Sequence, residues 1–202
     1  MQKRHRIFIA INLPLEIKKA LARYAEKFSD LPARWVPKDN LHITLAFLGN
    51  VTDSELGDIC MAAKAVAVQH PVLNIALNSV GYGPDEKLSL VSARHPVLNT
   101  IPKMVWASGE KSVPLQKLKQ DLGNTLQEKI NNFKPENRGF APHVTLARID
   151  TMQWRMIDPE ERPEVKQPID LLFTIESIEV MEAESGKNEP QYVVIESMQL
   201  GG

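Results

Sequence analysis

The sequence lacks most features that would place it in a specialised class of protein. Its single cysteine, Cys60, excludes an internal disulfide and favours a reducing cytoplasm. No stretch approaches eighteen uninterrupted apolar residues, so we expect no contact with a membrane. The basic segment 1–6 does not lead into a signal-peptide pattern, because Asn12 and Pro14 interrupt the apolar run that follows. The formal net charge of −1 argues against a protein that coats nucleic acid through its overall field.

The rest of the composition is that of an ordinary globular chain. Hydrophobic residues make up 43% of the sequence and charged residues 24%, which is sufficient for a substantial core. We therefore expect one domain over residues 1–202, cytoplasmic and monomeric, with Cys60 as a small core residue.

A short motif occurs twice, about a hundred residues apart. The first copy reads HITLA at residues 42–46, and the second reads HVTLA at residues 143–147. Composition alone predicts far fewer than one copy of His-x-Thr-Leu in a chain with 5 His. Apolar and polar residues alternate, so each copy predicts a strand with His and Thr on one face and the apolar residues, as far as Phe47, on the other. A structural histidine would not require a threonine to recur two residues later, so we interpret both motifs as functional.

Similar elements precede the two motifs, which indicates an internal duplication. Strand, helix and motif strand occur in this order in each half, and two lobes of this kind would bring the motifs to a shared cleft. Residues 151–168, rich in proline and charge, predict a surface excursion. The elements expected from periodicity and capping signals are strands over 7–13, 34–36, 41–48, 73–77, 103–107, 169–181 and 191–198, and helices beginning at Pro14, Thr52 and Pro114.

The sequence resembles the two-histidine phosphoesterase superfamily. The resemblance rests on RIFIAINLP at 6–14, RWVPKDNLHITLAFLG at 34–49 and PHVTLAR at 142–148. Within the superfamily, the chain is most similar to the RNA 2′,3′-cyclic phosphodiesterases, which are also described as 2′-5′ RNA ligases. The resemblance implies an α+β, bilobal fold in which two antiparallel sheets flank a central cleft, with the helices outside.

The same resemblance implies an activity and its residues. The activity is metal-independent opening of a 2′,3′-cyclic phosphate at an RNA end or on a nucleotide, which leaves a 2′-phosphate and needs no cofactor. The catalytic residues would be His42 as general acid and His143 as general base, with Thr44 and Thr145 binding the phosphate. The reverse reaction, 2′-5′ ligation, stays open. So does substrate preference, because segment 85–102 looks longer than the family usually has between its central strands.

The residue types support this chemistry without the family. Histidine has an unperturbed pKa near 6.5, so two of them can supply both the acid and the base that opening a cyclic phosphodiester requires. Threonine hydroxyls can donate to the non-bridging oxygens. Arg148 matches a basic position that the family uses near the substrate phosphate, but strict alternation puts it on the face opposite His143. It reaches the cleft only if the strand bends or ends near Ala147.

Two other interpretations remain. A zinc site would need three or four ligands, and neither motif has a Cys, Asp or Glu at the neighbouring position on the same face. A non-catalytic module that binds RNA ends or nucleotides could use the same cleft, although binding alone does not need two histidines. Trp35 and Trp106 could stack on a base, but aromatic residues beside a core more often pack against it.

Overall fold

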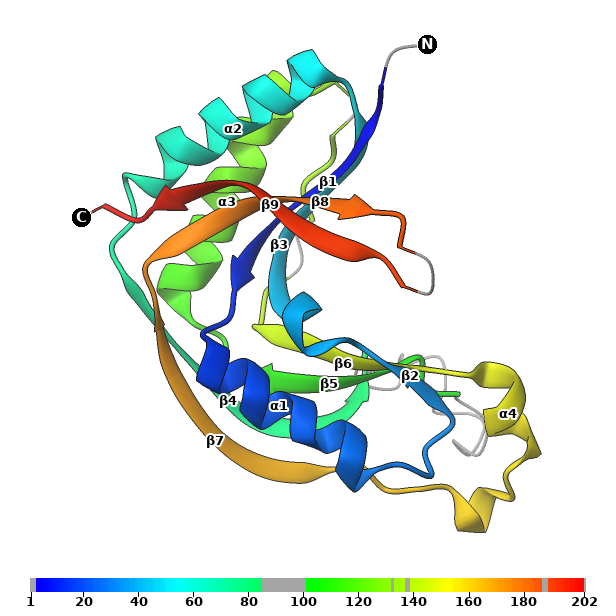
Figure 1. The fold of residues 1–202 in the computed structure, drawn as a ribbon. Coiled ribbons are helices and arrows are strands. Elements are labelled where there is room, and N and C mark those ends of the chain that lie inside the picture. Colours follow the sequence, from blue (N-terminus) through cyan, green and yellow to red (C-terminus); the bar gives the residue numbers. More distant parts are fainter. Residues whose placement is uncertain (1–2, 85–100, 132, 137–138, 187–188, 202) are drawn as a thin grey trace, which may run out of the picture.

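The structure is a computed structural model, which describes residues 3–84, 101–131, 133–136, 139–186 and 189–201. Two antiparallel sheets form two lobes, with helices on their outer sides (Figure 1). This confirms the α+β, bilobal fold. The strands are β1 (His5–Asn12), β2 (Ala33–Trp35), β3 (His42–Val51), β4 (Leu73–Gly83), β5 (Met104–Gly109), β6 (His143–Ile149), β7 (Gln167–Ile175), β8 (Ser177–Glu184) and β9 (Gln191–Gln199). The helices are α1 (Leu15–Lys27), α2 (Asp53–Ala67), α3 (Val113–Lys129) and α4 (Thr151–Met156), with short 3-10 turns η1 (Lys38–Asn40) and η3 (Pro159–Glu161).

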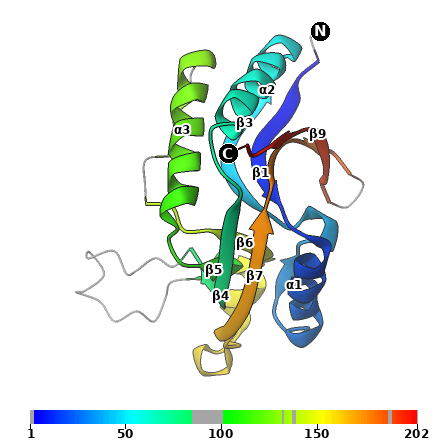
Figure 2. The ribbon, with the colours of Figure 1, turned by 90° about the vertical axis from the view of Figure 1, so that its left-hand side faces the viewer.

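The two motif strands lie in different sheets. The first sheet has the order β3-β1-β8-β9 and the second has the order β2-β6-β5-β4-β7. Helices α2 and α3 lie side by side, with α2 against the first sheet, whereas α1 lies beside the second (Figure 2). The predicted capping box at the start of α2 is present, with Thr52 and Glu55 satisfying each other's backbone N–H groups.

The predicted strand over 169–181 is wrong, because two strands occupy that stretch. Strand β7 pairs with β4 in the second sheet, whereas β8 pairs with β1 in the first. Glu176 lies between them, and its carbonyl accepts a hydrogen bond from Leu200 N. The chain therefore passes from one lobe to the other here, and continuous apolar patterning hides the change of sheet.

Both motif strands contain a β-bulge at the same point of the motif. The extra, unpaired residue is Leu45 in β3 and Leu146 in β6, the leucine of His-x-Thr-Leu in each case. The carbonyl of Leu146 instead accepts a hydrogen bond from Val36 N at 2.8 Å. The flanking pairs are Ile9–Ala46 and Ala10–Thr44 in the first sheet, and Val105–Ala147 and Trp106–Thr145 in the second.

The bulges reverse the alternation of faces beyond the motif. An inserted residue turns the side chains that follow it to the other face of the sheet, in β3 as far as a second irregularity at Leu48. The placement of Phe47 on the core face is therefore wrong, since its side chain is 74% exposed. Arg148, equivalent to Phe47 in the second copy, is exposed for the same reason and shares the face of His143. The bulge at Leu146 is thus the irregularity that Arg148 needs in order to reach the cleft.

The segment 151–168, predicted as a surface excursion, contains regular secondary structure. It contains α4 and η3, and Trp154 is buried against the core. Cys60 is half-buried, and burial raises the pKa of its thiol to about 11. Among the described residues, no helix is long and apolar enough to cross a membrane.

His5 should make the stability of the fold depend on pH. It is buried at the start of β1, where its ring nitrogens lie 3.0 Å from Asp53 Oδ1 and 2.9 Å from Glu182 Oε1. These hydrogen bonds, first to Asp53 and then to Glu182, raise the pKa of His5 above 6.5. The stabilisation is therefore fully present below pH 6.5, the unfolded value, and is lost as the pH rises through the folded pKa.

We accordingly expect His5→Gln to lower the melting temperature more at pH 5.5 than at pH 9. Thermal denaturation at both pH values measures this difference. Thr52→Ala, which removes the capping box of α2, is the control and should lower the melting temperature similarly at both. An equal effect of His5→Gln at the two pH values would contradict the role assigned to its charge.

Candidate active site

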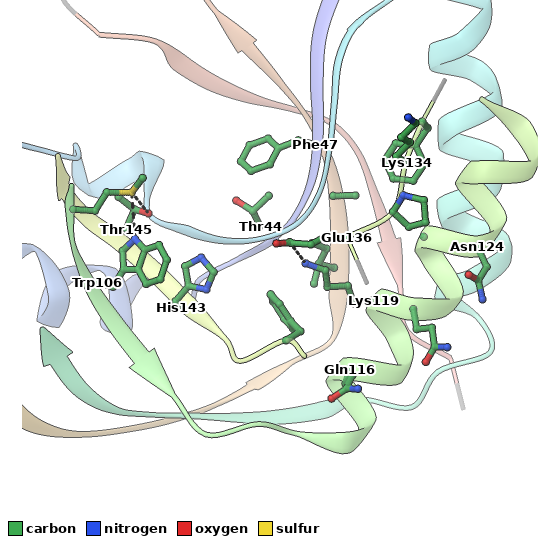
Figure 3. Close-up of a pocket in the computed structure, with 18 of the residues that line it drawn as sticks. Thr44, Phe47, Trp106, Gln116, Lys119, Asn124, Lys134, Glu136, His143 and Thr145 are labelled. Atoms are coloured by element: carbon green, nitrogen blue, oxygen red, sulfur yellow. Dashed lines mark hydrogen bonds and ion pairs between the residues drawn. The ribbon is translucent and has the colours of Figure 1, made fainter. Parts of the chain in front are cut away.

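The two motifs meet at one pocket between the lobes. Strands β3 and β6 contact each other, and a pocket of about 990 Å³ opens beside them. Its wall includes Thr44 from β3 and both His143 and Thr145 from β6 (Figure 3). His42 lies next to Thr44, with its Nε2 3.0 Å from Thr44 Oγ1. The structure thus brings together the four residues that the repeat singled out.

The backbone fixes the orientation of His42. Its Nδ1 lies 2.6 Å from the carbonyl oxygen of Asn40, which can only accept, so Nδ1 carries a proton. Nε2, at hydrogen-bond distance from Thr44 Oγ1, is therefore the nitrogen that can take part in proton transfer. The ring packs against Phe8 and Tyr192, with centroid separations of 5.0 and 5.2 Å.

A buried amide holds the turn that presents this carbonyl. The side chain of Asn40 donates to the carbonyl of Pro190 at 2.8 Å and accepts from the backbone N–H of Tyr192 at 3.3 Å. Lys18, buried on α1, donates to the carbonyl of Asp39 at 2.8 Å. Turn η1 is thereby attached to α1 and to the β8–β9 hairpin, so the acceptor for His42 is fixed.

The second histidine is held in the same way. His143 Nδ1 lies 3.2 Å from the carbonyl oxygen of Ala141, two residues before it, as Asn40 is before His42. The ring of Trp106 stacks on the imidazole, with centroids 4.1 Å apart and planes inclined by 26°. Trp106 is itself anchored by a hydrogen bond from its indole N–H to Met104 Sδ at 3.3 Å. Trp106 thus packs on His143, while Trp35 packs against the core.

Burial lowers the pKa of both imidazoles. For His42, the hydrogen bond to Asn40 opposes this effect, and the charges of Lys18, His143 and Arg148 add to it. A proton on His143 therefore disfavours a second proton on His42, so the singly protonated pair is accessible as a distinct state.

The charges around His143 differ from those around His42. Burial again has the largest effect on its pKa, and the hydrogen bond to Ala141 opposes it. Lys119 lowers the pKa further, whereas Glu136 raises it. The two imidazoles therefore have similar backbone supports but different ionic neighbours.

Much of the pocket wall was not anticipated from the sequence, including three residues that bear on ligand binding. Phe47 projects from β3, and Lys119 and Glu136 approach from α3 and the segment before β6 (Figure 3). Phe47 lies five residues after His42, as Arg148 lies five residues after His143. Comparison of the two copies could therefore have indicated Phe47. No local pattern marks the other two. Residues 85–100, which include most of the segment expected to affect substrate preference, lie outside the described residues.

A metal centre finds no support in the residue types at the pocket. Within the described ranges, no three His, Cys, Asp or Glu residues are grouped so that they could hold an ion. The ionisable and hydroxyl groups on the pocket wall are one imidazole, two hydroxyls, two amines, one guanidinium and one carboxylate, a set that suits an anion better than a cation.

Comparison with known proteins agrees with this geometry. Residues 11–90 match the family model described as LigT like Phosphoesterase, a range that includes the first motif. An RNA 2′,3′-cyclic phosphodiesterase of Geobacillus stearothermophilus is 29% identical over 204 residues, covering 99% of this chain and 59% of that protein. One from Thermotoga maritima is 27% identical, covering 82% of each chain. The chain is thus similar to LigT-like phosphoesterases around its first motif and to RNA 2′,3′-cyclic phosphodiesterases over most of its length.

Solved structures extend the similarity to the fold of the whole chain. The crystal structure of TT0787 of Thermus thermophilus has a TM-score of 0.77 at 25% identity and covers 98% of both chains. Escherichia coli LigT complexed with 3′-AMP has a TM-score of 0.72 at 23% identity, which compares the fold alone. The second motif, which lies beyond the family-model match, is thus within the region of structural similarity. The chain spans only about three fifths of the Geobacillus relative.

Proposed function

We propose that this protein is a two-histidine phosphoesterase that hydrolyses 2′,3′-cyclic phosphate ends of RNA to 2′-phosphomonoesters. The observation that carries the proposal is a pocket lined by Thr44, His143 and Thr145, with His42 beside Thr44. Each imidazole is held through Nδ1 by a backbone carbonyl, which leaves Nε2 as the nitrogen for proton transfer. The names of the Geobacillus and Thermotoga relatives support the same activity.

The proposed reaction is a displacement at phosphorus. His143 Nε2 takes a proton from water as the water oxygen bonds to phosphorus. His42 Nε2 gives a proton to O3′ as the bond from phosphorus to O3′ breaks. The pair ends with His143 protonated and His42 neutral, and exchange with solvent restores it. The net change is addition of one water molecule, so no redox partner is required.

The remaining groups bind the substrate. Thr44 and Thr145 donate to the non-bridging oxygens, and the Arg148 guanidinium matches two phosphate oxygens at once. Phe47 presents an exposed ring on the opposite wall, on which the terminal base can stack. The partner is therefore an RNA end or a nucleotide that carries a cyclic phosphate.

The deciding experiment uses oligoribonucleotides that end in a 2′,3′-cyclic phosphate. The expected product is the 2′-phosphate isomer, formed at the same rate in the presence of a chelator. Binding without turnover would favour the non-catalytic module, and loss of activity in chelator with recovery on adding zinc would contradict the metal-independent mechanism. Incubation with a 5′-hydroxyl oligonucleotide in the same assay would detect 2′-5′ ligation as the reverse reaction.

The rate should depend on pH with an acidic optimum. Only the pair with one neutral and one protonated imidazole is competent, so kcat/KM should be bell-shaped and peak midway between two pKa values. Burial lowers both from 6.5, which places the peak below pH 6.5. The peak of kcat should lie at higher pH, since a bound anionic phosphate favours protonated imidazole. A kcat/KM optimum above pH 7, measured where the protein stays folded, would contradict this assignment.

A further inference from the structure

A lysine on the pocket wall is not required by the reaction proposed above. Lys119 projects from α3 into the space that His143 and Thr145 face from β6 (Figure 3). Only 12% of its side chain is exposed, and its Nζ lies 3.1 Å from Glu136 Oε2. A cation and its counterion therefore occupy one side of a site built for an anion.

The position of Lys119 does not depend on Glu136. Its ammonium lies 4.2 Å from the centroid of the Phe140 ring, a cation–π contact that holds it at the pocket wall. Glu136 is 63% exposed, and an ion pair with one solvated partner contributes little stability. A phosphate that approaches Lys119 can therefore replace the carboxylate at small cost, because the lysine is already in place.

The pocket has room for more than the terminal cyclic nucleotide. Its volume of about 990 Å³ lies at the upper limit of the roughly 300 to 1,000 Å³ that holds a drug-sized ligand. The cyclic phosphate at the motifs has Arg148 on the same strand face as His143. Lys119 belongs to a different wall, on α3, so it is available to a second anionic group of the same ligand.

We propose that Lys119 binds the phosphodiester that precedes the terminal nucleotide, and that Glu136 neutralises Lys119 until the substrate binds. The preferred substrate class is then an oligoribonucleotide with a cyclic phosphate end, rather than a cyclic mononucleotide. This inference rests on the proposed function and adds a second phosphate subsite to it.

The test compares adenosine 2′,3′-cyclic phosphate with a trinucleotide that ends in a 2′,3′-cyclic phosphate, each at its own pH optimum. Lys119→Gln should lower kcat/KM at least ~10-fold more for the trinucleotide than for the mononucleotide, mainly through KM. The slope of log KM against log salt for the trinucleotide should fall by about 0.7, the value for one single-strand phosphate contact. Glu136→Gln should act in the opposite direction and raise kcat/KM for the trinucleotide. Lys117→Gln, on an exposed position of α3 outside the pocket wall, is the matched control.

Other outcomes would contradict either the second phosphate subsite or the proposed function. Equal losses of kcat/KM on both substrates would place Lys119 in the chemical step through His143 and overturn the subsite. No loss on either substrate would also overturn it. So would a lower kcat/KM of Glu136→Gln for the trinucleotide. Failure of the unaltered protein to turn over either substrate would contradict the proposed function instead. In that case, anisotropy with a labelled trinucleotide tests the subsite: an unchanged Kd for Lys119→Gln overturns it. Thermal denaturation of Lys119→Gln checks that the fold is retained.

Discussion

Replacing either His42 or His143 with alanine is expected to reduce the turnover of a cyclic phosphate by roughly 10²- to 10⁴-fold, the usual contribution of a positioned proton-transfer group. The loss should appear in kcat, because the hydroxyls of Thr44 and Thr145 and the charge of Arg148 remain to bind the phosphate. Steady-state kinetics on an oligoribonucleotide with a cyclic phosphate end measures the effect. Binding of the 2′-phosphate product to the same variants is the control for an intact pocket.

The double replacement tests whether the histidines act as a pair. Removing both should cost less than the product of the single effects, since one partner has little to do once the other is absent. Thr44→Ala and Thr145→Ala should be milder, because each removes a hydrogen-bond donor rather than a proton-transfer step. Near-normal turnover by His42→Ala or His143→Ala would show that the pair is not the catalyst, and the non-catalytic module would then be the better account.

The motif residues and the order of elements could be predicted because their signals are local. Alternation over a few residues reveals a strand, and the repeat of His-x-Thr-Leu marks two strands as related. From these features come the bilobal fold and the grouping of Thr44, His143 and Thr145 at one pocket, with His42 beside Thr44. Their roles in catalysis stay a proposal.

The two-residue alternation of side chains between the faces of a sheet fails where a strand pairs irregularly. The bulges at Leu45 and Leu146 exist only in the register with a neighbouring strand, and their leucines look like ordinary core residues. Alternation alone therefore places Phe47 on the wrong face and leaves Arg148 dependent on a bend. The bulge occurs at the same motif position in both copies. It therefore belongs to the duplicated unit rather than to the local propensity of either strand.

Lys119 and Glu136 could not have been paired from the sequence. They lie 17 positions apart, on a helix and on a segment without regular structure, and neither belongs to a repeat. Their proximity arises from the packing of segment 133–136 along α3, where Pro135 lies against Gly123. A Cβ at Gly123 would come within 2.9 Å of the Pro135 side chain, so a small residue there permits the approach.

Replacing Arg148 with alanine is expected to lower kcat/KM by roughly 10²- to 10³-fold, which is typical for the loss of one preorganised group that stabilises transition-state charge. The bulge at Leu146 turns the guanidinium to the face of His143 and Thr145, where it can bind two phosphate oxygens at once. Arg148→Lys keeps the charge but loses the planar fork, so it should recover only part of the activity. Phe47→Leu, at the equivalent position of the first copy, is the matched comparison and should raise KM with little change in kcat. If Arg148→Ala stayed within a few-fold of the unaltered protein, the second bulge would serve only the packing of β6 against β2, and the guanidinium would not contact the phosphate.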